Sequence, residues 1–239
     1  MANPATLALA AGVPLALVLF LGFFLLSPLA AVVFALVAWV VVGVSVWRLA
    51  SQVVLRLVGG VAPDLTAVGP ARLDSLVTSV SAAAGVPRPA LLVVDDPAPN
   101  ALVTGRTARE ATLVVTSGLL DRLDRLQLES VVAHQLALVR AGETHGRDTS
   151  VLVLGLPATR FRSFRGLART ALFDGERRTL ALDATAVGVT RYPPALLQAL
   201  GIAAAQPPVG GHPALGPLWW FPADRRDLDV RLDHVRELT

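Results

Sequence analysis

The sequence predicts an α+β protein, mostly helical, in which an N-terminal two-helix transmembrane hairpin precedes a domain with a small sheet. Two observations predict this class. Residues 1–47 carry no charged side chain. Beyond residue 63, short apolar runs bounded by Pro, Gly and Asp lie between helical segments, which is typical of short strands. We expect a hairpin at 1–50, a juxtamembrane linker at 51–62 and a single domain at 63–239.

The hairpin consists of two apolar runs, Ala5 to Leu26 and Leu29 to Ala50. Each is long enough to cross a hydrocarbon core of ~30 Å. Only Ser27 and Pro28 separate them, so the pair predicts two membrane spans joined by a tight turn. A secretory signal peptide is the competing interpretation, but no basic segment precedes the first run and a second apolar run follows at once.

Charge around the spans predicts their orientation. Arg48 and Arg56 follow the second run, whereas the segment before the first run has no Arg or Lys. By the positive-inside rule, the C-terminal domain is then cytoplasmic and the N-terminus lies on the same side. We therefore expect a multi-pass protein of the cell membrane, with the lipid bilayer as one partner.

Composition argues against nucleic-acid binding. All 21 basic residues are Arg, and Ala, Val and Leu dominate the chain, which indicates a GC-rich coding bias. Basic and aromatic residues do not alternate as in a known RNA or DNA module, so no nucleic-acid partner is expected. The chain has no Cys, which excludes disulfides and thiolate metal sites and fits a cytoplasmic domain.

Periodicity and turn residues place the elements of the domain. A helix is expected over 72–84, followed by strands at 91–94, 101–104 and 112–116. Asp124 and Gln127 have the spacing of a capping box, so the next helix begins at Asp124 or Arg125. That helix is apolar on most faces, which predicts that it is buried.

The chain after this helix alternates polar and apolar stretches. Residues 143–148 are predicted to form a polar loop, and the apolar stretch 151–156 is too short to span a membrane. A further helix is expected at 179–190. Near the C-terminus, Trp219 and Trp220 pack in the core or lie at the membrane interface.

Three consecutive motifs carry a resemblance to a known family. They are Asn100-Ala-Leu-Val-Thr-Gly105, Leu113-Val-Val-Thr-Ser-Gly-Leu-Leu120 and Leu126-Gln-Leu-Glu-Ser-Val-Val-Ala-His134. This order resembles the HtpX-type membrane zinc metallopeptidases, which are gluzincins. The likeness covers about residues 63–200 and is strongest at 99–140. It implies a zincin-like, HtpX-peptidase-like domain with a central helix equivalent to the metal-binding helix.

The resemblance also identifies the equivalents of the catalytic residues. The family motif His-Glu-x-x-His supplies two zinc ligands one helical turn apart and a Glu as general base. Here only His134 is retained, because Gln135 stands at the base position and Leu138 at the second ligand. A Gln amide is not a base near neutral pH, and a Leu side chain has no ligand atom.

The third ligand of the family is a Glu on a later helix, followed four residues on by a supporting Asp. The matching run places Thr179 at the Glu position and retains Asp183. Glu176 lies one turn earlier, and His145, His212 and His234 have no ligand motif behind them. The chain is therefore a degenerate member by this resemblance, and no metal cofactor is expected.

Two binding surfaces are candidates. In the family, an edge strand pairs with an extended substrate peptide, and the resemblance assigns that role to the strand at 112–116. The groove candidates are Asn100, Ala101, Thr112, Leu113, Val114, Val115 and Thr116. A basic segment interleaved with Phe is a candidate for an anionic membrane surface, or for a solvated helix or a loop over the groove. Its residues are Arg160, Phe161, Arg162, Phe164 and Arg165.

These observations predict a membrane-anchored pseudopeptidase that acts as a binding, scaffold or regulatory protein for an unidentified membrane protein or peptide. One alternative is an active zinc metalloendopeptidase with relocated ligands, in which case zinc is the cofactor. The other is a structural subunit of a membrane complex that is recognised through the hairpin.

Overall fold

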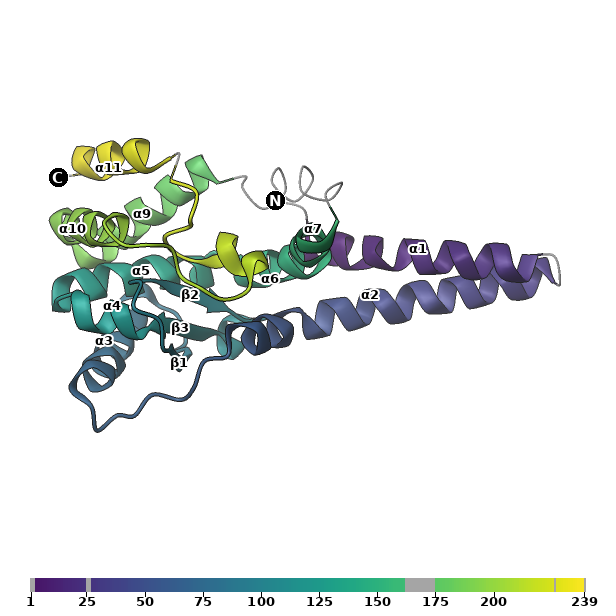
Figure 1. Ribbon diagram of the computed structural model, residues 1–239, viewed down its shortest axis with the longest axis horizontal. Coiled ribbons are helices and arrows are strands. Elements are labelled where there is room, and N and C mark those ends of the chain that lie inside the picture. The colour runs from purple at the N-terminus through teal and green to yellow at the C-terminus, as the bar shows by residue number, and fades with distance from the viewer. Residues whose placement is uncertain (1–2, 25–26, 162–174, 226, 239) are drawn as a thin grey trace.

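The computed structural model describes residues 3–24, 27–161, 175–225 and 227–238. Helices α1 (Pro4–Phe24) and α2 (Pro28–Val58) form a long hairpin that projects from one side of a globular domain (Figure 1). Three of the residues predicted to contact the membrane surface lie outside the described residues; they are Arg162, Phe164 and Arg165.

Both hairpin helices are long and apolar enough to cross a membrane, over Pro4–Gly22 and Pro28–Val58. Most of their side chains are exposed, as expected for a surface that meets lipid rather than a protein core. Ser27 caps α2, with its hydroxyl accepting a hydrogen bond from the Ala30 amide at 3.4 Å, and Pro28 occupies the first turn. These features place the predicted turn residues, Ser27 and Pro28, at the start of α2.

The two hairpin helices approach each other closely. A Cβ atom added to Gly12 would lie 2.6 Å from the Trp39 carbonyl oxygen, so only glycine fits there. The Trp39 indole donates to the Leu9 carbonyl at 2.7 Å, which satisfies a polar group that lipid would leave unpaired. Small residues and an interhelical hydrogen bond thus hold the hairpin together.

The predicted linker at 51–62 is wrong over most of its length, because α2 continues without a break to Val58. Ser51 and Val54 are buried against the domain. The apolar and small residues on one face of this last stretch therefore serve as domain core, and the helix ends at Gly59, which adopts a left-handed conformation with φ 69°.

A three-stranded sheet lies at the centre of the domain. It contains β1 (Ala90–Val94), β2 (Ala101–Thr104) and β3 (Thr112–Thr116) in the order β1-β3-β2. Strand β3 runs parallel to β1 and antiparallel to β2. The prediction of an edge strand at Thr112–Thr116 is therefore wrong, because β3 is the central strand and all five residues are buried.

Both faces of the sheet are covered, which explains why β2 and β3 read as apolar runs rather than alternating ones. Leu113 and Val115 face the main core, whereas Leu102 and Val114 face a second core that includes Val54 of α2. The helices around the main core are α3 (Val68–Ala84), α4 (Ser117–Arg122), α5 (Arg125–Arg140), α9 (Glu176–Thr190), α10 (Pro193–Ala204) and α11 (Leu228–Glu237).

Helix α5 starts as predicted. The Asp124 carboxylate accepts from the Gln127 amide at 2.9 Å, and the Gln127 side chain accepts from the Asp124 amide at 3.0 Å. After α5, the segment predicted as a polar loop forms α6 (Thr144–Ser150) instead, and a π-helical turn leads to α7 (Leu156–Arg160) beside the start of α1 (Figure 1).

A buried carboxylate explains why the polar segment is helical. Asp148 of α6 is fully buried and accepts hydrogen bonds from Ser51 Oγ at 2.7 Å, Thr104 Oγ1 at 2.5 Å and the Gly105 amide at 3.0 Å. Burial raises the pKa of Asp148 to about 6, against the lowering effect of these three donors. The carboxyl joins the hairpin, the sheet and α6 at one point.

Candidate functional site

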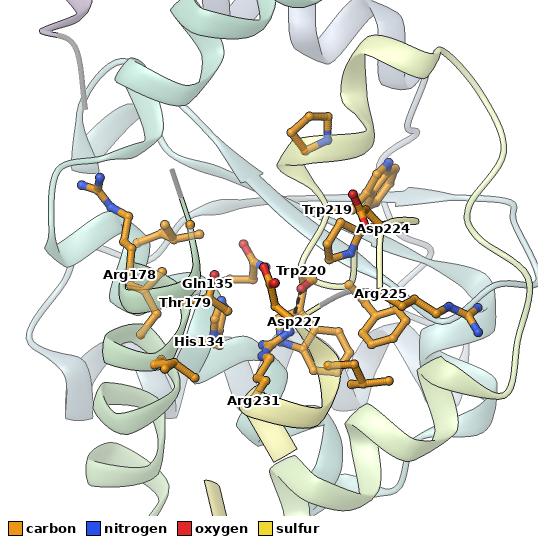
Figure 2. A pocket seen from close by; sticks show the side chains of 18 of the residues that line it. His134, Gln135, Arg178, Thr179, Trp219, Trp220, Asp224, Arg225, Asp227 and Arg231 are labelled. Atoms are coloured by element: carbon orange, nitrogen blue, oxygen red, sulfur yellow. Dashed lines mark hydrogen bonds between the residues drawn. The ribbon is translucent and has the colours of Figure 1, made fainter. Parts of the chain in front are cut away.

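A cavity of about 350 Å³ opens between α5, α9 and the segment from 217 to 231. Figure 2 shows His134, Gln135 and Thr179 toward one side of this cavity and Trp219, Asp224 and Arg225 toward the other. The helix pair α5 and α9 therefore brings together residues that are about forty-five positions apart in the chain.

The polar centre beside the cavity is a bridged carboxylate. His134 Nδ1 lies 2.8 Å from Asp183 Oδ1, and Arg231 Nη2 donates to the same oxygen at 2.8 Å. Arg231 Nε donates to the other oxygen, Asp183 Oδ2, so the guanidinium binds the carboxylate with two nitrogens. Asp183 is fully buried, and it accepts three hydrogen bonds inside the protein, two at Oδ1 and one at Oδ2.

The protonation states follow from these contacts. Burial lowers the pKa of His134 more than the Asp183 carboxylate raises it, so the ring is neutral at neutral pH. Burial raises the pKa of Asp183, but the Arg231 guanidinium and His134 outweigh this and hold it well below its usual range. An ionised carboxylate only accepts, so Nδ1 carries the proton of His134 and Nε2 is left as an acceptor.

The other predicted site positions also meet at this cavity. Gln135, Leu138 and Thr179 all line it together with His134. Helical spacing predicts the shared position of His134 and Leu138, and the family resemblance implied that of Thr179. The Gln135 side chain is fully buried; its Nε2 donates to the Ala101 carbonyl at 3.4 Å, while its Oε1 has no partner among the described residues. The imidazole of His134 is thus accompanied by an amide, an alkyl and a hydroxyl side chain, from Gln135, Leu138 and Thr179 respectively.

The remaining histidines lie elsewhere. His145 packs its ring against Trp47 of α2, with ring centroids 5.6 Å apart. His212 accepts a hydrogen bond from the Ala214 amide at 3.2 Å, and His234 lies on α11. Of the four histidines, all of which the structure describes, only His134 lines the cavity.

The outer edge of β2 is occupied by the chain itself. The Trp220 amide donates to the Ala101 carbonyl at 2.7 Å. Asn100 donates to the Phe221 carbonyl at 2.6 Å and accepts from the Phe221 amide at 3.0 Å. Arg231 Nη1 also donates to the Trp220 carbonyl at 3.2 Å. We call residues 219–222 the edge segment; it takes the place that a pairing peptide would need.

The groove candidates therefore need correction. Asn100 and Ala101 contact the edge segment, and both are buried. The other five candidates form the central strand and pair with a neighbour on either side, so no peptide reaches their main chain; these are Thr112, Leu113, Val114, Val115 and Thr116. Trp219 and Trp220 lie in the core, as one of the two predictions had it.

Comparison with known proteins agrees with this architecture. The family model described as peptidase family M48 matches residues 69–197, more than half of the chain. The chain belongs to peptidase family M48. Within the matched region lie the sheet, helix α5 with His134, and helix α9 with Thr179 and Asp183.

Curated relatives in the M48 family point to the HtpX-type branch. The chain is 42% identical over 84 residues to "Protease HtpX homolog" of Dictyoglomus thermophilum, covering 35% of this chain and 28% of that protein. For the homologue of Salinibacter ruber, identity is 35% over 135 residues, covering 56% and 45%. For that of Tropheryma whipplei it is 42% over 85 residues, covering 36% and 28%. The chain spans less than half the length of these relatives. No solved structure matches it significantly.

Sequence reasoning missed three residues of this M48-type site. Arg231 belonged to no motif in the sequence, yet it binds Asp183 and the edge segment. Arg147 lines the cavity from α6, and Trp220 closes the edge of β2. Arg231 follows Asp227 by four residues, but this spacing does not identify its partner. That partner is Asp183, which lies 48 positions earlier in the chain.

Proposed function

We propose that this M48 family member is membrane-anchored and binds a partner at its site without hydrolysing it. The observation that carries the proposal is the bridged carboxylate. Asp183 is shared between His134 and Arg231, while Gln135, Leu138 and Thr179 stand at the positions where the family has its base and two ligands. The frame of the site is retained, and its donor atoms are changed.

The donor set does not fit zinc. A catalytic zinc needs about three protein ligands and a base that takes a proton from bound water. In the described part of the chain, no three His, Cys, Asp or Glu side chains form a group that could hold a metal ion. Burial is the main cause that lowers the pKa of His134, and the Asp183 carboxylate that opposes it is already bound by Arg231. We therefore propose no metal-dependent step.

A metal and activity assay tests this proposal. The full-length protein, purified in detergent, is expected to contain far less than one zinc per chain and to leave an unfolded casein-type substrate intact. A variant carrying Gln135→Glu, Leu138→His and Thr179→Glu serves as a positive control for zinc uptake. Stoichiometric zinc in the wild type that is lost on His134→Ala, or chelator-sensitive cleavage, would establish an active peptidase instead.

We further propose that the domain lies on the cytoplasmic side of the cell membrane. Arg48 and Arg56, both exposed, lie in the C-terminal part of α2 next to the domain, and they support this orientation by the positive-inside rule. Arg160 and Phe161 are exposed at the end of α7, near the base of the hairpin (Figure 1). This placement supports contact of α7 with the membrane surface, where Arg meets anionic headgroups.

A further inference from the structure

An extended peptide cannot pair with the outer edge of β2 beside the cavity. The edge segment occupies the outer side of β2, where an extended peptide would pair, and Asn100 fixes it at both the amide and the carbonyl of Phe221. The remaining space of about 350 Å³ is at the small end of ligand-binding pockets. The site therefore suits a small ligand or the end of a chain.

The buried side of the cavity offers two free acceptors on consecutive residues. Gln135 Oε1 belongs to a fully buried side chain and has no partner among the described residues. His134 uses Nδ1 for Asp183, which leaves Nε2 as the ring atom available to the cavity. Buried acceptors without a partner are costly, so a ligand that brings an N–H donor removes this cost.

One cation at the cavity has no salt bridge to a described residue, although Asp148 and Glu143 stabilise its charge from a longer distance. Arg147 is half-buried and donates to the Pro217 carbonyl at 2.6 Å, yet it has no salt bridge to a described residue. Arg231 differs, because the Asp183 carboxylate neutralises it, and Arg178 is paired with Glu143. The Arg147 guanidinium stays protonated at neutral pH even though burial lowers its pKa.

Among the described residues that line the cavity, the acidic ones are Asp224 and Asp227. Asp227 is exposed, so water and salt screen its charge more than that of half-buried Arg147. Figure 2 shows Asp224 beside Trp219 and Asp227 below Trp220, toward the middle of the view. A ligand that combines an anion with a neighbouring N–H group matches the Arg147 guanidinium, which has no salt bridge, and the unpaired acceptors of Gln135 and His134.

We infer that the cavity binds an N-acyl amino-acid carboxylate, the chemistry of a peptide carboxyl terminus. Its carboxylate accepts from Arg147, its amide N–H donates to Gln135 Oε1 or His134 Nε2, and an apolar side chain packs against Leu138 and Trp220. This inference rests on the proposed non-hydrolytic function, and it names the ligand class of the same site.

The test compares an acid with its amide on the full-length protein in lipid nanodiscs. N-acetyl-leucinate is titrated while tryptophan fluorescence is followed, since Trp219 and Trp220 line the cavity. We expect saturable binding, with N-acetyl-leucinamide at least ~10-fold weaker because a charge-assisted hydrogen bond is lost. A longer peptide with a free C-terminal Leu distinguishes a chain end from a small metabolite by tighter binding.

Variants locate the ligand. Arg147→Gln is expected to weaken N-acetyl-leucinate by about 10-fold or more and to remove the preference for acid over amide. Arg109→Gln is the matched control and should bind as the wild type. Arg109 is an exposed arginine in the turn between β2 and β3, and it does not line the cavity. Gln135→Leu should weaken acid and amide alike, since both ligands present the same N–H.

Three outcomes would overturn the inference: no binding, equal binding of acid and amide by the wild type, or displacement of the acid by inorganic phosphate at equal concentration. The acid and amide comparison needs no variant, so a misfolded Arg147→Gln protein leaves the test intact. Zinc content and integrity of the peptide are measured in the same samples. Zinc with cleavage contradicts the proposed function, whereas a zinc-free protein that ignores carboxylates contradicts this inference alone.

Discussion

At the scale of single residues, one carboxylate accounts for the character of the site. Asp183 is fully buried and holds His134 from one side and Arg231 from the other. A buried charge is tolerated only when it is paired and hydrogen-bonded, and removing one partner leaves the other uncompensated. Arg231 supplies the positive charge that offsets the Asp183 carboxylate, so α9 and α11 are joined by an internal ion pair.

Replacing the carboxylate should destabilise the fold strongly. Asp183→Asn leaves Arg231 buried without a counterion, and we expect the free energy of unfolding to fall by about 3 to 5 kcal/mol. Urea unfolding followed by circular dichroism in detergent measures this, with exposed Asp121→Asn as the control. The folded-state pKa of Asp183 lies below the unfolded value of ~4. The contribution of Asp183 to the free energy of unfolding is therefore present above pH ~4 and is lost as pH falls through the folded-state pKa. Unchanged stability would contradict the ion pair.

At the scale of elements, two contacts decide how the parts join. Asp148 links α2, the end of β2 and α6 through Ser51, Thr104 and Gly105. Asn100 links β2 to the edge segment. Both are single polar side chains that satisfy main-chain or hydroxyl groups of segments distant in sequence, and buried polar groups of this kind fix one arrangement among many apolar ones.

The contacts of Asp148 predict a pH dependence of stability that is opposite in sign to that of Asp183. Its folded pKa of about 6 lies above the unfolded value of 3.8, so its contribution to stability is full below pH 3.8 and is lost as pH rises through 6. A shift of this size corresponds to ~3 kcal/mol between the two ends of that window. Asp148→Asn should flatten the profile of unfolding free energy from pH 4 to 6.5, measured by urea titration. If the slope persists in the variant, another group is responsible.

The edge segment predicts a pattern of amide exchange. In the wild type, the Trp220 and Phe221 amides should exchange slowly, because both are hydrogen-bonded to β2 or its preceding residue. Asn100→Ala leaves the Phe221 amide and carbonyl unpaired, which costs about 2 to 4 kcal/mol and should speed Phe221 exchange. The amides of the β2–β3 ladder serve as internal controls. Fast exchange of Phe221 in the wild type would show that the edge of β2 is open.

At the scale of the whole molecule, the hairpin and the domain form one continuous structure. Helix α2 leaves the apolar region and enters the domain core without a break, carrying Val54 to the second face of the sheet (Figure 1). Since α2 is a structural part of the domain, a change in the direction of the hairpin would move the sheet with it. With the membrane placement proposed above, this connection predicts a fixed distance between the cavity and the membrane surface.

The proposed orientation is testable because the chain has no cysteine. Single variants Ser27→Cys, at the hairpin turn, and Arg109→Cys, in the domain, carry the only thiol of the protein. In intact cells, a membrane-impermeant maleimide applied from outside should label Ser27→Cys and spare Arg109→Cys until the cells are opened. The reverse pattern would place the domain outside. If neither variant is labelled before the cells are opened, the result would contradict a hairpin of α1 and α2 that spans the membrane.

Much of this molecule follows from its sequence. Apolar run lengths determined the two spans, the Asp124 and Gln127 spacing determined the start of α5, and the three strand segments were placed to within one residue. Helical spacing also placed His134, Gln135 and Leu138 on one helix, and the family resemblance implied that Thr179 would join them at one site. These features depend on local hydrogen bonding and periodicity, which neighbouring residues specify.

Only the tertiary structure decided the rest. Strand order made β3 central rather than an edge, the edge segment closed β2, and Arg231 reached Asp183 across 48 positions. It also turned a polar stretch into α6 by burying Asp148 beneath α2. The physical reason is that pairing order and buried charge depend on which distant segments meet, and no local pattern carries that information. His134 retains its family position, but the packing around it gives the site its present chemistry.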